Sequence, residues 1–407
     1  MVSDYATRPA ASSDLDLFSD KVLADPHPFY EALRATGPAV RLERHGVWAI
    51  PRHADAAAVL HDTAAFRSEG GLALTGLAND VLLAGTVLAA DGDRHARLRR
   101  VLSRQLAPRA ARGLAQEITA RADRLADQHL NNPGGVFDAV HLARDLVTGT
   151  VMSLMGLPPG HEQTVIDGAG ATFNAFGPSN PRYQAALPQA TAMVTFLHEH
   201  VTRDTVTPGS WMGAIFDAVD ARQIQECDAV PLAAAYTAAS MDTTIYGIAE
   251  MLVQLARHPA QWDALRANVD GLAEAAFHEA LRYEAPIQGF GRIVTRPADI
   301  GGTRIDAGEQ VWLLYGSAGR DLERWGPDAD QYNLHRPGNG HHLAFGHGPH
   351  LCAGIPLALL QATALLHALA TGCTRLTLAD EPTRLVHNIL RGWQRAPIRP
   401  TPARDRS

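Results

Sequence analysis

The sequence of 407 residues has few of the residues that build disulfide frameworks, zinc clusters or nucleic-acid surfaces. Its three cysteines, Cys227, Cys352 and Cys373, are too scattered for a disulfide scaffold or a zinc site. Cysteine usage of this kind favours a reducing cytoplasm. Lysine is nearly missing, since Lys21 is the only one, and the formal net charge is −7. With no basic run, the chain is not expected to bind nucleic acid in general.

Long apolar segments are also few. Residues 1–20 carry five charged side chains and no apolar core, so we predict neither a signal peptide nor a membrane anchor there. Elsewhere charged residues such as Arg144 and Asp145 interrupt the apolar windows, and we predict no membrane-spanning helix. Apolar residues make up 46% of the chain, which is enough for a substantial core. We expect a soluble, cytoplasmic protein.

The most informative stretch is Phe345-Gly-His-Gly-Pro-His-Leu-Cys-Ala-Gly354. A lone buried cysteine is most often a small core hydrophobe. Here, however, three glycines in nine residues allow a tight backbone whose N–H groups approach something flat or charged. Cys352 also opens the mostly apolar helical pattern Ile355–Leu365, and a helix start favours a thiolate. Such a thiolate is a soft, strongly donating ligand for iron, so we predict that Cys352 binds a metal.

This stretch resembles the haem-binding signature of the cytochromes P450 at each defining position: Phe345, Gly346, Gly348, His350, Cys352 and Gly354. The resemblance implies that Cys352 is the axial thiolate of haem b, which is iron protoporphyrin IX. It also implies that His350 reaches a haem propionate and that Phe345 packs near the sulfur. The thiolate would push electron density through the iron and favour O–O cleavage.

Helical patterns dominate from Asp93 onward, and strand patterns are short. We predict helices over residues 114–130, 136–157, 189–203 and 231–256, with Pro188 at the start of the third. Strands are predicted over 40–42, 47–50, 300–306 and 310–315. The fold is mainly α with small β-sheets. The resemblance implies the cytochrome P450 fold, a single large helical domain over 1–407 with a minor β-rich part and an N-terminal extension at 1–25.

His95 and Arg99 lie four residues apart and project from one helix face. By spacing alone they could be an ordinary solvated polar face. Their resemblance to the family's His-x-x-x-Arg implies a pair that binds a haem propionate, where a cation gains a charge-assisted bond. Arg292, which follows Pro286, is implied to be a further propionate-binding residue.

The segment Ala239-Ser-Met-Asp-Thr-Thr244 places adjacent polar residues inside an apolar helix, where burial is costly. A threonine there can bond a carbonyl one turn back and open the helix. The segment is either a satisfied polar patch or a functional site. It resembles the oxygen-binding segment of P450s, which implies that Asp242 and Thr243 deliver protons during O2 cleavage. Ser240 stands where glycine is usual, which narrows this groove.

Glu279 and Arg282 are three residues apart on a predicted helix. As a surface pair they would contribute only a few tenths of a kcal/mol. They match the family's Glu-x-x-Arg, and Arg336 fits the third member of that buried network. The resemblance implies a structural role, in which the three residues hold the haem-binding loop.

Phe173 and Phe176 precede the break Gly177–Pro181, and such an aromatic pair is ordinarily core. The family places substrate-contacting residues in this region, and the implied pocket comprises Phe173, Phe176, Ala238, Ala239, Phe290 and Ile389. The residues 68–90 are expected to cover the pocket or to form a plain surface loop.

The pocket pattern is similar to that of bacterial P450s that oxidise small para-substituted aromatic compounds, including benzoic-acid O-demethylases. The loop Ser68–Gly71 lacks the arginine of those benzoate enzymes, and Ala234 and Ala235 replace polar residues. A carboxylate left unpaired in an apolar pocket binds poorly. We therefore expect a neutral or differently anchored aromatic substrate.

The resemblance implies a monooxygenase that inserts one oxygen atom from O2 into a small aromatic substrate, by hydroxylation or O-demethylation. The sequence has no flavin or iron–sulfur motif, so electrons must come from a ferredoxin or flavodoxin with its reductase. Arginines on the cysteine side of the haem would dock an acidic partner. Alternatives are an enzyme acting on a larger natural product or aromatic peptide, a peroxide-using enzyme, and a haem sensor or electron carrier. The pair Asp242 and Thr243 argues against the peroxide-using enzyme, the haem sensor and the electron carrier.

Overall fold

The computed structural model describes residues 11–131 and 135–403. The predictions made for residues 1–10 therefore lie outside the described part. The helices are α1 (Asp20–Ala24), α2 (His27–Thr36), α3 (His53–His61), α4 (Gly92–Leu106), α5 (Pro108–Gly113), α6 (Ala115–Leu130), α7 (Ala139–Met155), α8 (Glu162–Ala175), α9 (Pro181–His200), α10 (Trp211–Asp220), α11 (Ala229–Ala239), α12 (Asp242–Arg257), α13 (Pro259–Ala267), α14 (Val269–Tyr283), α15 (Tyr315–Ala318), α16 (Leu322–Trp325) and α17 (Ile355–Gly372).

Strands and short helical segments complete the chain. The strands are β1 (Ser12–Ser13), β2 (Val40–Leu42), β3 (Val47–Ile50), β4 (Phe66–Arg67), β5 (Phe137–Asp138), β6 (Gly289–Val294), β7 (Ala298–Ile300), β8 (Thr303–Ile305), β9 (Gln310–Leu314), β10 (Cys373–Leu378), β11 (Thr383–Arg384), β12 (Trp393–Arg395) and β13 (Pro397–Pro402). A π-helical turn, η1 (Ala78–Leu82), and the 3-10 turns η2 (Glu226–Asp228), η3 (Asn339–His341) and η4 (Gly348–His350) lie between them.

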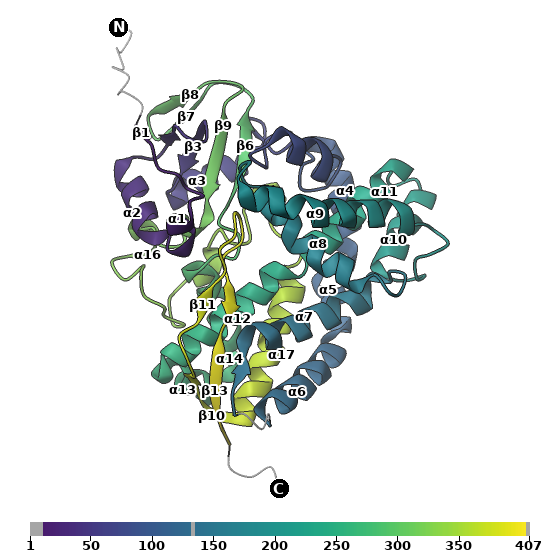
Figure 1. Ribbon diagram of the computed structural model, residues 1–407, viewed down its shortest axis with the longest axis vertical. Coiled ribbons are helices and arrows are strands. Elements are labelled where there is room, and N and C mark those ends of the chain that lie inside the picture. Colours follow the sequence, from purple (N-terminus) through teal and green to yellow (C-terminus); the bar gives the residue numbers. More distant parts are fainter. Residues whose placement is uncertain (1–10, 132–134, 404–407) are drawn as a thin grey trace.

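A β-rich part lies beside a larger helical part, as the resemblance implied (Figure 1). The largest sheet has the strand order β1-β2-β3-β9-β6-β4. The predicted hairpin of β2 and β3 is confirmed, with Val40 opposite Ala49. Strand β9 pairs in parallel with β3 and antiparallel with β6, which places Phe290 opposite Leu313. This pairing fixes the strand that carries both Phe290 and Arg292.

The single strand predicted over 300–306 is wrong, because β7 and β8 form a hairpin there. Gly301 and Gly302 make the turn with φ of 57° and 86°, a conformation that glycine adopts without strain. The prediction that Pro188 begins a helix is also wrong, because Pro188 lies inside α9. That helix begins earlier because Pro181 occupies its first position and the Asn180 side chain accepts a hydrogen bond from the Tyr183 N–H at 3.0 Å.

The apolar helix predicted over 231–256 is divided into α11 and α12 by Ser240 and Met241. The Ser240 hydroxyl donates to the Tyr236 carbonyl, and the Thr243 hydroxyl donates to the Ala239 carbonyl at 3.2 Å. Hydroxyls that bond to backbone carbonyls one turn back compete with the helix ladder and bend it. The polar segment thus interrupts the helix that passes through the middle of the molecule.

The helical part packs around α12 and α17. Nearly all of α12 is buried, and it contacts α7 and α14, while α17 contacts α6 and α14. We predicted that no apolar segment is long enough to span a membrane. That prediction is wrong for Ile355–Gly372, which is long and apolar enough to do so by length and composition alone. This segment is α17, and 61% of it is buried inside the protein, so it is a core helix.

The described part of the predicted N-terminal extension is packed onto the sheet. Strand β1 pairs in parallel with β2, with Ser12 opposite Arg41. Leu17, Phe18 and Val22 are each at most 5% exposed. Residues 11–25 therefore contribute to the core of the β-rich part.

Candidate active site

A largely apolar cavity lies where the helical and β-rich parts meet. Segments far apart in the sequence form its wall, from η1 and α4 to β6 and the loop before α17. The predicted site residues on this wall are Arg99, Phe173, Phe176, Ala238, Ala239, Thr243, Phe290, Arg292, Phe345, His350, Cys352 and Gly354. The structure thus brings most of the predicted residues to one cavity.

The loop Phe345–Gly354 holds the Cys352 sulfur at this cavity. The Cys352 N–H donates to the Phe345 carbonyl at 2.8 Å, and the Gly354 N–H donates to Sγ of Cys352 at 3.3 Å. Gly348 has a φ of 67°, and a Cβ on it would lie 2.7 Å from the Leu60 carbonyl oxygen. The helix itself begins three residues after the cysteine, at Ile355, so Cys352 precedes the helix and does not open it.

Burial raises the pKa of the Cys352 thiol, because a charged sulfur would lose its hydration. The Gly354 and Ile355 N–H groups and the Arg99 guanidinium lower it, though not enough to cancel the effect of burial. The sulfur is therefore surrounded by donors that suit a thiolate, and a bound cation would complete that environment.

Buried nitrogen donors gather beside this loop. Nε2 of His95 is buried and has no hydrogen-bond partner among the described residues. The ring of His95 lies 4.1 Å from that of His350, centroid to centroid. Burial, His350 and Arg99 lower the pKa of His95 to about 4, so its imidazole is neutral at pH 7. His95 is not itself on the cavity wall, whereas His350 is.

Two arginines face the cavity from different elements. Arg99 on α4 donates to the Leu351 carbonyl next to the cysteine. Arg292 on β6 is 3% exposed and donates one bond, to the Gly291 carbonyl at 2.7 Å, which leaves further N–H groups for a ligand. The His350 imidazole, two guanidinium groups and a cysteine sulfur around one cavity, with the unpaired His95 imidazole next to His350, fit a flat metal cofactor with acidic substituents. The residues present therefore fit the haem that the sequence resemblance implied.

Asp242 and Thr243 project to different sides of α12. Thr243 is on the cavity wall, but Asp242 is not. The Asp242 carboxylate faces α8, where a Cβ on Gly170 would lie 2.9 Å from Oδ2. Burial raises the pKa of Asp242 from 3.8 to about 6, although Arg144 opposes the shift. The predicted acid–alcohol pair is thus adjacent in sequence but divided between the cavity and the α8 side.

The aromatic side chains of the cavity contact one another, edge to face for Phe173 with Phe176 and Phe290 with Tyr315, and tilted for Phe176 with Phe290. Ring centroids are 5.7 Å apart for Phe173 and Phe176, 6.4 Å for Phe176 and Phe290, and 6.3 Å for Phe290 and Tyr315. Such arrangements are favoured by the ring quadrupoles. We call these four residues the aromatic wall. Its fourth member, Tyr315, was missed because it follows an ordinary strand pattern.

Ile389 is fully buried but does not lie on the cavity wall, although the sequence resemblance placed it there. The adjacent Leu390 forms a β-bridge with Ile287, and Ile287 is the residue that lines the cavity. Its neighbour Asn388 is bonded to Asn174 and Asn180, which ties this segment to α8 and α9. The segment therefore supports the wall from behind.

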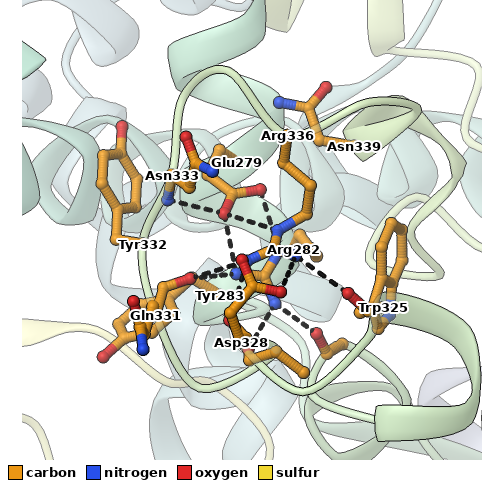
Figure 2. Close-up of polar contacts among 12 residues, drawn as sticks. Glu279, Arg282, Tyr283, Trp325, Asp328, Gln331, Tyr332, Asn333, Arg336 and Asn339 are labelled. Atoms are coloured by element: carbon orange, nitrogen blue, oxygen red, sulfur yellow. Dashed lines mark hydrogen bonds and ion pairs between the residues drawn. The ribbon is translucent and has the colours of Figure 1, made fainter.

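Glu279, Arg282 and Arg336 form a buried network (Figure 2). Arg282 donates to both Glu279 oxygens, at 2.8 and 2.7 Å, and Arg336 donates to Oε1 at 3.2 Å. Arg282 also donates to the carbonyls of Gly319 and Ala329. The network joins α14 to residues 319–336, the segment that leads to the cysteine loop.

A second buried cluster surrounds Glu284, just beyond the end of α14. Its carboxylate contacts His27 at 3.1 Å, Arg320 at 2.9 Å and Arg384 at 3.3 Å, and also bonds Arg391. Sequence reasoning missed this cluster because its members come from distant segments with no local spacing signal. Burial acts to raise the pKa of Glu284, but the charges of Arg391 and Arg384 outweigh it and hold the pKa well below its usual range.

The chain is similar in sequence to known proteins over nearly its whole length. Residues 220–371 match the family model described as Cytochrome P450. The chain is 35% identical over 391 residues to cytochrome p450 CYP199A2 of Rhodopseudomonas palustris, which covers 96% of this chain and 94% of that protein. It is 32% identical to the cytochrome P450 monooxygenase PikC of Streptomyces venezuelae, over 95% and 94% of the two chains.

Among solved structures, cytochrome P450 CREJ in complex with (4-ethylphenyl) dihydrogen phosphate superposes with a TM-score of 0.81. The match covers 93% of this chain and 98% of that one, at 26% identity. The chain belongs to the cytochrome P450 family. It is a P450 monooxygenase, and family membership implies a haem-thiolate cofactor and redox partners that supply electrons.

The buried network predicts a large effect of Glu279→Gln. Loss of the carboxylate leaves the buried guanidinium of Arg282 without a counter-charge and leaves Arg336 with Asp328 alone, which should cost about 3–5 kcal/mol of stability. A lower urea midpoint would report the loss. Glu226→Gln, which breaks a surface pair with Arg203, is the matched control and should leave the midpoint nearly unchanged. Equal midpoints for both variants would contradict the structural role of Glu279.

Asp242→Asn should stabilise the protein in a pH-dependent way. With its pKa raised to about 6, folded Asp242 binds more protons than the unfolded chain between pH 3.8 and 6, so stability falls as pH rises through this window. Asparagine does not titrate, so the variant avoids this loss of stability. Its free energy of unfolding should equal that of the wild type at pH 3 and exceed it fully by pH 7. Urea midpoints across this range measure it, with the exposed Asp217→Asn as control. A gain independent of pH would argue against a buried carboxylate.

Proposed function

We propose that this P450 uses haem b and O2 to hydroxylate or O-demethylate a small, uncharged aromatic molecule. One observation carries the proposal: Cys352 and Thr243 lie on a single cavity whose wall is otherwise largely apolar and aromatic. A thiolate ligand, a proton donor and a largely apolar site are the contributions that this chemistry needs from the protein.

The chain's own residues bind and orient the cofactor. When bound, haem b would supply the O2 chemistry, with Cys352 as the thiolate ligand that donates electron density. His350, Arg99 and Arg292, with His95 next to His350, would hold the propionates through charge-assisted hydrogen bonds. The donor arrangement described for the cysteine loop supports this assignment, since Gly354 donates to the sulfur that Phe345 helps to position.

Asp242 and Thr243 would supply protons in two stages. Asp242, buried on the α8 side with a pKa of about 6, exchanges a proton near neutral pH, where an acid–base group is most effective. Thr243 holds its hydroxyl proton at Oγ1 on the cavity wall. The division between the two sides of α12 keeps the charged carboxylate out of the substrate cavity.

The cavity offers a poor site for an anionic substrate. The hydroxyls of Thr86 and Thr172 donate to the Leu83 and Gly168 carbonyls, at 2.8 and 2.7 Å, and carry no charge. Arg99 and Arg292 are assigned to the propionates. A benzoate carboxylate would therefore stay unpaired in apolar surroundings. The bound (4-ethylphenyl) dihydrogen phosphate of cytochrome P450 CREJ supports a para-substituted ring, although that ligand carries a charge.

A ferredoxin or flavodoxin with its reductase would supply the electrons. A hollow lined by Arg99, Ser103, Pro108, Cys352 and Pro356 opens the cysteine side of the site to the surface. The arginines of α4 lie beside it, and positive charge there would attract an acidic partner. We also propose that the whole chain forms one P450 domain and works in the cytoplasm.

Thr243→Ala should separate electron consumption from oxidation. Without the hydroxyl the proton supply at the cavity fails, so less product and more hydrogen peroxide should form per electron delivered by a ferredoxin system. Product and peroxide are both quantified against reductant consumed. Thr237→Ala removes a buried hydroxyl from α11 that does not line the cavity, and should keep normal coupling. Unchanged coupling in Thr243→Ala would remove the relay role, and turnover with peroxide alone would contradict the O2-dependent reaction.

Ligand binding tests the substrate class. Displacement of water from the haem iron shifts the Soret band, so a panel of para-substituted aromatics can be titrated against the purified holoenzyme. We expect uncharged members such as 4-methoxyacetophenone to bind at least about tenfold more tightly than 4-methoxybenzoate, because the benzoate charge finds no free partner. Tighter binding of the benzoate would refute the argument for an uncharged substrate.

A further inference from the structure

Tyr315 is a buried residue whose hydroxyl has no partner among the described residues and is not fully enclosed by them. The residue is 4% exposed and lines the cavity at the start of α15. Its backbone is fixed, because its N–H donates to the Gln288 carbonyl at 2.9 Å and its carbonyl accepts from the Gly319 N–H at 3.0 Å. Within residues 11–131 and 135–403, however, nothing hydrogen-bonds to its hydroxyl. A buried hydroxyl left unpaired is costly unless a ligand or water completes it.

Most other uncharged polar groups of the cavity are already occupied. Tyr236 donates to the Leu102 carbonyl at 3.1 Å, and the hydroxyls of Thr86, Thr172, Ser240 and Thr243 also donate to carbonyls. Thr244 and Gln361 line the cavity without a side-chain partner in the described residues, but neither belongs to the aromatic wall. Tyr315 is thus the member of that wall with a free polar group.

The position of Tyr315 suits a hydrogen-bond donor. Its ring stands edge-on to Phe290, at an interplanar angle of 83°, so the hydroxyl belongs to the same wall that would contact an aromatic ring. Burial raises the pKa of Tyr315, while Arg292 acts in the opposite direction. The hydroxyl therefore stays protonated at neutral pH and can donate to a ligand.

We infer that the Tyr315 hydroxyl selects the substrate by donating a hydrogen bond to a neutral acceptor on the ring, such as a ketone, ether or amide carbonyl. This inference rests on the proposed function and names the anchor that replaces an arginine. A site that offers a buried donor discriminates against a ligand lacking the acceptor, because the donor is then left unpaired. The apolar wall alone would not distinguish two ligands of the same shape.

A pair of ligands with the same shape tests this inference. 4-Methoxyacetophenone carries a ketone where 4-isopropenylanisole carries a methylene, and Soret titration of the holoenzyme gives both dissociation constants. The wild-type protein should prefer the ketone by about threefold to tenfold, the range expected for one net hydrogen bond. Tyr315→Phe should abolish that preference, because the ketone loses its donor and the alkene no longer leaves one unpaired.

Tyr183→Phe is the matched control, because Tyr183 is buried in the same core cluster but does not line the cavity. It should keep the wild-type preference. Equal binding of the two ligands by the wild-type protein would overturn the inference while leaving an aromatic substrate intact. The inference would also be overturned if the Tyr315→Phe protein kept the preference for the ketone but lost haem to apomyoglobin faster. The hydroxyl would then bond to a haem propionate. Failure of both ligands to shift the Soret band would defeat the aromatic substrate and the inference together.

Discussion

The structure depends on holding one cysteine sulfur at the cavity among donors that can support a negative charge. Burial alone raises the pKa of the Cys352 thiol, and the backbone donors and Arg99 only partly oppose this. A bound cation would supply the remaining stabilisation, since a coordinated thiol is deprotonated outright. This environment fits the haem-thiolate cofactor that membership of the family implies. The Gly354 N–H at 3.3 Å orients the sulfur, and the left-handed Gly348 lets the loop approach α3 closely.

The end of α14 holds the two halves of the site together. Glu279 and Glu284 are five residues apart, and both are buried among arginines from other segments. Such buried ion pairs add little net stability, but breaking one leaves an uncompensated charge, so they favour one arrangement over its alternatives. Glu279 fixes the segment that leads to the cysteine loop (Figure 2). Glu284 joins Arg320 to Arg391, which adjoins the Leu390–Ile287 bridge behind the cavity wall. One helix end thus connects to both the cysteine loop and the cavity wall.

Short motifs that resemble the family indicated the parts of the site whose geometry is set within one segment, where spacing alone would have favoured surface pairs. The cysteine loop, the pair His95 and Arg99, and Glu279 with Arg282 are such cases. Predictions failed where a choice depended on the rest of the molecule. Pro188 lies inside α9 because the cap at Asn180 begins the helix earlier, and the side of α12 that Asp242 faces depends on α8. The Glu284 cluster and Tyr315 had no local signal, since strands and loops distant in sequence give them their surroundings.

The interruption between α11 and α12 connects these features. In a continuous helix, Asp242 and Thr243 would differ in direction by the rotation of one residue, about 100°. Here the Ser240 hydroxyl takes the Tyr236 carbonyl and the Thr243 hydroxyl takes the Ala239 carbonyl, which ends α11 at the cavity. Serine in place of the glycine usual in the family therefore fills the groove and also supplies one of the bonds that interrupt the helix. Both hydroxyls are hydrogen-bonded to backbone carbonyls. The two residues therefore interrupt the helix and add no charge to the cavity. That property fits an uncharged ligand held by the aromatic wall.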